Sequence, residues 1–158
     1  MNSPEKRMQD VDYRQTILLV DDRPENIASL EALLDDGRRE LLSATSGERA
    51  LQLLLEHEVA LVLLDVQMPV MNGIEATEAV KNKYPQLKII MLTVFDNDEN
   101  IFKSIKAGAD GYFLKEVNPQ ELYNGIVETL NGGAAMTPSI ALKTLKLLRE
   151  PVSFDESV

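Results

Sequence analysis

The sequence predicts an α/β domain in which the strands of a parallel sheet alternate with helices. The first observation behind this prediction is a set of short apolar runs that end in a polar or charged residue. Residues 61–64, followed by Asp65, form the clearest of these runs. A run this short, stopped soon afterwards by Pro69, is typical of a strand that is buried on both faces. The second observation is that apolar residues at helical spacing follow each run, and this alternation predicts right-handed crossovers between parallel strands.

The predicted elements are bounded by recognisable capping and stop signals. Strands are expected at residues 16–20, 40–45, 61–64, 88–93 and 111–115, and helices at about residues 24–36, 47–56, 73–84, 98–107 and 119–131. Ser46 and Asn118 are predicted N-caps, and Asn72 with Glu75 has the spacing of a capping box. Gly37 and Gly108 are expected to close the helices that precede them.

Five alternating units predict a doubly wound, flavodoxin-like sheet of five parallel strands with the order 2-1-3-4-5. We assign this domain to residues 16–131, and the polar, aperiodic residues 1–15 to a flexible tail. An extra helix is predicted to follow Thr137 and to run to about Arg149, outside the alternating pattern. We interpret residues 132–150 as a linker with this helix, whose apolar stripe offers a surface for a homodimer, and residues 151–158 as an acidic tail.

The bulk composition excludes several classes of function. The chain has 158 residues, of which 44% are hydrophobic, so it can bury a real core. Its net charge of −10 argues against direct binding to nucleic acid or to an anionic membrane. It contains no cysteine, which excludes disulfides and thiolate chemistry. There is no signal-peptide pattern and no stretch long enough to cross a bilayer, so we expect a cytoplasmic protein without a membrane partner.

Polar residues that could carry chemistry follow the ends of four predicted strands. Because parallel strands end at one edge of the sheet, these residues are expected to converge there: Asp21, Asp22, Asp65, Thr93 and Lys115. Carboxylates about 4 Å apart repel by about 4 kcal/mol per pair at an effective dielectric near 20. A divalent cation or a raised pKa must relieve this repulsion, and carboxylate oxygens suit Mg²⁺. A metal, a carboxylate nucleophile, a hydroxyl and a lysine are the groups that phosphoryl transfer uses.

The pattern resembles the receiver domain of two-component response regulators over about residues 16–131. The residues that carry the resemblance are Asp21-Asp22, Asp65-Val66-Gln67-Met68-Pro69, Asn72-Gly73, Thr93 and Gly108-Ala109-Asp110-Gly111-Tyr112-Phe113-Leu114-Lys115. The resemblance implies that Asp65 is the phosphoacceptor, taking its phosphoryl group from a histidine kinase or a histidine phosphotransfer protein. It also implies that Asp22 and Asp65 ligate Mg²⁺ directly, Asp21 through water, and Gln67 through its backbone carbonyl.

The same resemblance implies a switch near the last strand. Lys115 and Thr93 would bind phosphoryl oxygens, and Tyr112 would be the aromatic residue that turns inward when the threonine moves. Two residues depart from the family pattern. Val94 replaces a small residue and could crowd the inward movement, and Glu116 replaces the proline that usually follows the lysine. A cis peptide before a residue other than proline costs about 3 kcal/mol, which argues against the cis bond common in the family.

The resemblance leaves the output open. Residues 132–141 and the Lys115-Glu116 pair resemble regulators of transcription with a C-terminal helix-turn-helix, which would lie outside this chain. Residues 20–26 look more like receivers attached to hybrid kinases or other enzymes, and a stand-alone receiver is a further alternative. The chain is therefore expected to be a signalling switch and not an enzyme. At most it catalyses its own phosphorylation and dephosphorylation.

Two other classes fit the sequence less well. A phosphohydrolase with an aspartyl intermediate needs a second acid two residues after the nucleophile, where Gln67 stands and cannot shuttle a proton. A flavin or nucleotide binder would need a glycine-rich phosphate loop after the first strand, where Asp21 and Asp22 would repel a phosphate.

Overall fold

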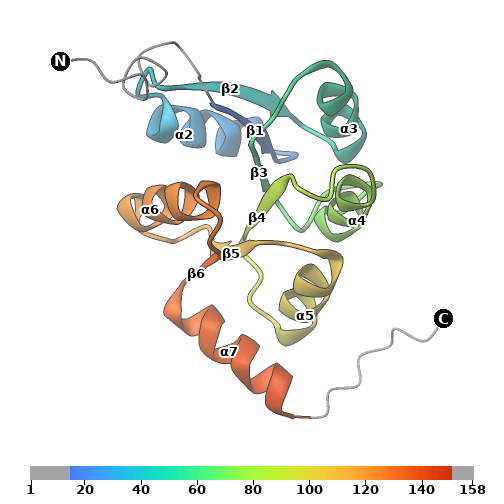
Figure 1. The fold of residues 1–158 in the computed structure, drawn as a ribbon, viewed down its shortest axis with the longest axis vertical. Helices are drawn as coiled ribbons and strands as arrows, with labels where there is room; N and C mark the ends of the chain where they lie inside the picture. Colours follow the sequence, from blue (N-terminus) through green and yellow to red (C-terminus); the bar gives the residue numbers. More distant parts are fainter. Residues whose placement is uncertain (1–14, 151–158) are drawn as a thin grey trace.

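The computed structural model describes residues 15–150. The predicted tails, residues 1–15 and 151–158, lie outside the described residues except for Gln15, which belongs to the first strand and not to a tail. The centre of the fold is a parallel sheet with the strand order β2-β1-β3-β4-β5-β6 (Figure 1). The strands are β1 (Gln15–Val20), β2 (Arg39–Ala44), β3 (Leu61–Leu64), β4 (Lys88–Thr93), β5 (Gly111–Leu114) and β6 (Ala135–Met136). The α/β class and the order of the first five strands are confirmed.

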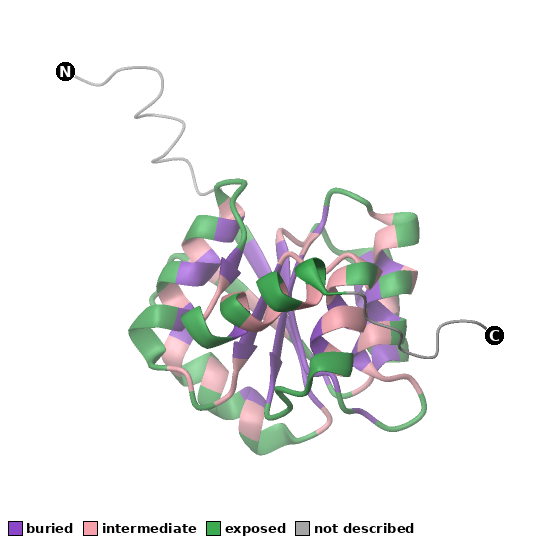
Figure 2. Cartoon of the chain, turned by 90° about the horizontal axis from the view of Figure 1, so that it is seen from below, coloured by how far each residue is buried: buried purple, intermediate pink, exposed green. Residues whose placement is uncertain are grey.

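Helices cover both faces of the sheet. They are α2 (Pro24–Leu34), α3 (Gly47–Glu56), α4 (Gly73–Lys83), α5 (Asp98–Ala107), α6 (Pro119–Leu130) and α7 (Pro138–Arg149). Helices α2 and α6 lie on one face, and α3, α4 and α5 lie on the other (Figure 1). Each face has its own core cluster, and the central strands β1, β3 and β4 are buried on both sides, as Figure 2 shows, whereas the edge strand β2 is only partly buried. None of the helices within residues 15–150 is long and apolar enough to cross a membrane.

The predicted helix caps are largely present. The side chain of Ser46 accepts from the backbone N of Arg49, and Asn72 and Glu75 form the reciprocal capping box. Helix α2, however, ends at Leu34, three residues before Gly37. Gly37 instead takes a positive φ of 76° in the loop, where a residue with a side chain would be strained.

A sixth strand was not predicted. Ala135 and Met136 pair in parallel with Gly111 and Tyr112 of β5, so part of the expected linker belongs to the sheet. The close approach depends on Gly111, because a Cβ atom there would lie 2.7 Å from the carbonyl oxygen of Ala135. The extra helix α7 follows directly and packs beside α5.

Candidate functional site

Asp65 stands directly after β3 at the carboxyl edge of the sheet. Its backbone N donates to the carbonyl of Val20 (3.0 Å), which continues the pairing of β3 with β1. Its Oδ1 atom accepts weakly from the backbone N of Gln67 (3.4 Å). Gly73 packs against its backbone, and a Cβ atom on that glycine would overlap the carbonyl oxygen of Asp65. These contacts fix a carboxylate that is only 6% exposed.

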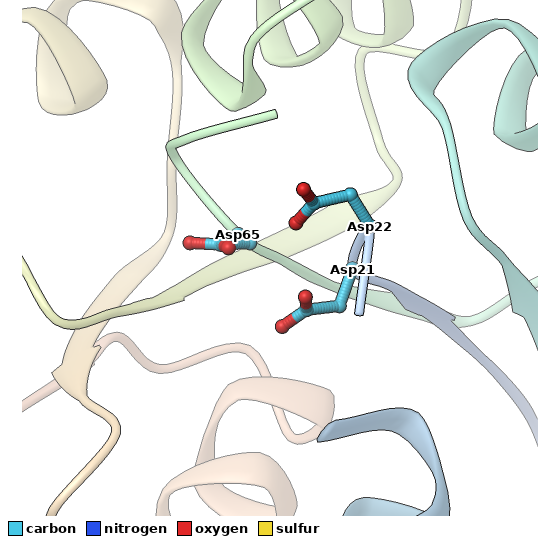
Figure 3. A group of neighbouring side chains, drawn as sticks. All are labelled: Asp21, Asp22 and Asp65. Atoms are coloured by element: carbon cyan, nitrogen blue, oxygen red, sulfur yellow. The ribbon is translucent and has the colours of Figure 1, made fainter. Parts of the chain in front are cut away.

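Asp21 and Asp22 follow the neighbouring strand β1 and converge on Asp65 (Figure 3). One carboxylate oxygen from each of the three residues lies within 4.8 Å of the others. Asp21 is held by local donors, since its Oδ1 accepts from the backbone N of Arg23 (2.9 Å) and its Oδ2 from Nδ2 of Asn26 (3.2 Å). The predicted convergence of the three carboxylates is therefore present.

Lys115 supplies the cation of the site from the residue after β5. Its Nζ atom lies 2.6 Å from Oδ2 of Asp21 and 3.2 Å from Oδ2 of Asp65. Its backbone N donates to the carbonyl of Thr93 (2.8 Å), which aligns the ends of β4 and β5. One ammonium group thus bridges carboxylates from two different strands.

The pKa of the Asp65 carboxyl is raised above its ordinary value. Burial is the main cause, because it disfavours the charged form, and the negative charge of Asp21 adds to it. Lys115, by charge and hydrogen bond, and the backbone N of Gln67 act in the opposite direction. The pKa of Asp65 is raised even though Lys115 is close. Lys115 alone therefore does not offset the cost of burying the Asp65 charge, and a further cation would stabilise the carboxylate.

A cavity of about 520 Å³ opens beside this carboxylate. Its lining includes both oxygen-rich and cationic groups: Asp22, Arg23, Asn26, Asp65, Gln67, Val94, Phe95 and Lys115. An all-oxygen set of carboxylates, with room for water, is what a hard cation such as Mg²⁺ requires. The residues present therefore fit such an ion.

Thr93 and Tyr112 lie behind the cavity and do not line it. Both are fully buried. Thr93 Oγ1 accepts from the backbone N of Phe95 (3.3 Å), and the Tyr112 hydroxyl donates to the carbonyl of the same residue. Burial, together with the charges of Asp96 and Asp65, raises the pKa of Tyr112 well above its ordinary value. Val94 is 65% exposed, so it does not keep Tyr112 out of the interior here.

Arg23 and Asn26, two residues without a predicted role, also line the cavity. Asn26 lies in the first turn of α2, five residues after Asp21, and its amide holds the Asp21 carboxylate. The only signal for it in the sequence was its place just after the acidic pair. An asparagine in a first helical turn is too common to predict such a contact.

Known proteins share both the sequence pattern and the fold. The model of the response regulator receiver domain family matches residues 17–127. The chain belongs to this family. It is 33% identical over 110 residues to the transcriptional regulatory protein DegU of Brevibacillus brevis, covering 70% of this chain and 47% of DegU. The chain spans about half to three-fifths of the length of the curated relatives it matches.

Solved structures share the fold of this chain. A two-component response regulator of the LuxR family from Aurantimonas superposes with a TM-score of 0.78 at 29% identity, covering 87% of this chain and 99% of that one. The signal receiver domain of an HD domain-containing protein from Pseudomonas fluorescens gives a TM-score of 0.73 at 32% identity, covering 75% and 96%. The same fold thus occurs in a regulator of the LuxR family and in a protein that contains an HD domain.

Proposed function

We propose that Asp65 accepts a phosphoryl group from a histidine kinase or a histidine phosphotransfer protein. The supporting observation is the position of its carboxylate, which lies among Asp21 and Asp22 with Lys115 Nζ at 3.2 Å. In the transfer, an oxygen of Asp65 forms a bond to phosphorus while the bond from phosphorus to the donor histidine nitrogen breaks. Lys115 binds a phosphoryl oxygen, because its ammonium group is already aimed at the acceptor carboxylate.

The cation proposed for the site is Mg²⁺. Asp22, Asp65 and Gln67 line the cavity and are assigned as direct ligands, Gln67 through its backbone carbonyl. Asp21 already accepts from the Arg23 backbone, Asn26 and Lys115, which favours a contact through water instead. When bound, the ion supplies positive charge that offsets the carboxylates and the incoming phosphoryl oxygens.

Thr93 and Tyr112 form the proposed switch. The doubly charged phosphoryl group attracts the Thr93 hydroxyl, whose oxygen accepts from the Phe95 backbone before phosphorylation. The loop at Phe95 then rearranges together with Tyr112, which donates to its carbonyl. Phosphorylation thereby shifts the populations of two arrangements of this face.

The output is proposed to be regulation of transcription through a domain outside this chain. DegU is a transcriptional regulatory protein, and this chain matches less than half of its length. The alternatives are a receiver attached to a hybrid kinase, which residues 20–26 favour, and a stand-alone receiver. In either case the site acts in the cytoplasm, and its chemistry is limited to its own phosphorylation and dephosphorylation.

Intact-mass measurement after incubation with Mg²⁺ and acetyl phosphate tests the proposal. The mass should rise by one phosphoryl group, and Asp65→Asn should abolish the gain. Asp35→Asn, which changes an exposed aspartate after α2, is the matched control and should be phosphorylated like the wild type. Phosphorylation that persists in Asp65→Asn would place the acceptor elsewhere. Turnover of an aryl phosphate would instead favour a phosphohydrolase.

A further inference from the structure

The last helix of the described chain is tied to the loop that follows β4. Lys143 of α7 donates from Nζ to the backbone carbonyl of Asp96 (2.9 Å) and lies 3.4 Å from its Oδ2 atom. Both contacts involve the Lys143 side chain, which is 37% exposed. The link is therefore one that a small movement of the loop can break.

The same loop is attached to the proposed switch residues. Phe95, next to Asp96, donates from its backbone N to Thr93 Oγ1 (3.3 Å) and accepts from the Tyr112 hydroxyl. Two hydrogen bonds at Phe95 and the contact at the adjacent Asp96 thus connect Thr93 of β4 and Tyr112 of β5 to Lys143 of α7.

Apolar packing connects α7 to the same region. Ile140 of α7 is fully buried and belongs to the core cluster that includes Ile101 of α5 and Tyr112 of β5. Met136 of β6, just before the helix, pairs with Tyr112. Figure 1 shows α7 lying beside α5 and following from β6 at the edge of the sheet. The helix therefore covers the switch instead of leading away from it.

We propose that phosphorylation of Asp65 loosens α7 from the domain, and that docked α7 in turn opposes phosphorylation. This inference rests on the proposed function, because it requires Thr93 to bind a phosphoryl group on Asp65. When Thr93 Oγ1 turns toward that group it leaves the backbone N of Phe95, and the displaced loop takes the Asp96 carbonyl away from Lys143. Coupling between two sites is reciprocal, so a helix released by phosphorylation must, when docked, disfavour phosphorylation.

Hydrogen exchange measured by mass spectrometry on the full chain tests the inference, with intact mass followed in the same samples. With Mg²⁺ and acetyl phosphate, the amides of α7 should exchange about two- to fivefold faster, the range expected for loss of one exposed charged contact. Amides of α3, on the far side of α4, should be unchanged. Unchanged or slower exchange in α7, in a sample whose mass shows phosphorylation, would overturn this inference and leave the proposed function standing.

Lys143→Met removes both the charge and the donor of the link, and it leaves the buried face of α7 unchanged. In this variant the α7 amides should already exchange faster without phosphodonor, and the initial rate of phosphorylation should rise about two- to fivefold. Lys146→Met, on the exposed side of the same helix, is the matched control and should behave like the wild type. Equal behaviour of the two variants would contradict the inference. A complete lack of mass gain in the wild type would instead remove the proposed function, and the inference with it.

Discussion

Two cavities of similar size lie at opposite edges of the sheet, and only one is lined by a cluster of reactive side chains. The cavity at the carboxyl edge has a volume of about 520 Å³, and the one at the amino edge about 540 Å³. The second is lined by residues that precede or begin strands, with neighbouring helix ends: Gln15, Thr16, Leu54, His57, Glu58, Val59, Ala60, Tyr84 and Leu87. Volume therefore does not distinguish the two.

Strand direction does distinguish them. At the carboxyl edge, residues that leave β1, β3 and β5 bring three carboxylates and one ammonium group together. Helices α2 and α4 also begin there, and the amino ends of helices favour anions. At the amino edge, α3 and α4 end, and the lining offers one carboxylate and one imidazole, from Glu58 and His57. A phosphoryl group is therefore expected to bind at the first edge and not at the second.

The strongest test of this comparison is to remove the nitrogen-bearing side chain, Lys115 or His57, from each edge in turn. Lys115→Met should slow phosphorylation by acetyl phosphate about 100- to 1000-fold, as expected when a charge that stabilises the developing transition state is lost. His57→Ala, at the other edge, should leave the rate unchanged. The rates are read from intact mass over time, and circular dichroism checks that both variants fold. A slow His57→Ala variant, or a fast Lys115→Met variant, would show that the two edges are not functionally distinct.

Mg²⁺ should raise the free energy of unfolding through the carboxyl edge and not through the amino edge. At a concentration 100 times its Kd, an ion that binds only the folded state adds about 2.7 kcal/mol to the free energy of unfolding. Asp22→Asn should lose most of this gain, while Glu58→Gln should keep all of it. Urea unfolding with Mg²⁺ and with a chelator measures both. Equal gains in the two variants would mean that the ion binds somewhere other than the acidic cluster.

The carboxyl edge could be predicted from the sequence because its residues depend on local signals. Asp21, Asp65 and Lys115 each stand directly after an apolar run, and parallel strands leave little choice about where such residues lie. The capping box at Asn72 and Glu75 is similarly local, and it is present. The site residues could be predicted from two signals alone, the spacing of the apolar residues and the polar residue that ends each apolar run.

Features set by tertiary packing were missed. Strand β6 has two residues, too few for a periodic pattern, and it forms because Gly111 lets Ala135 approach closely. The contact of Lys143 with Asp96 joins a helix to a distant loop, and no spacing in the sequence indicates it. The segment after α6 was consequently interpreted as a linker, although it completes the sheet.

The smallest expected effect is a pH-dependent change in stability that depends on the Asp65 carboxyl. The pKa of this carboxyl is higher in the folded protein than its ordinary value of 3.8, mainly because of burial. Its contribution to stability is therefore present below the unfolded-state pKa and is lost as the pH rises through the raised folded-state value. In the presence of a chelator, Asp65→Asn should unfold at slightly higher urea concentration than the wild type at pH 7. That advantage should shrink as the pH falls toward 3.8 and the wild-type carboxyl becomes protonated.

Glu58→Gln should show no such pH-dependent gain, since Glu58 is exposed at the other edge. An Asp65→Asn variant less stable than the wild type at pH 7 would mean that the attraction of Lys115 outweighs the cost of burying the charge.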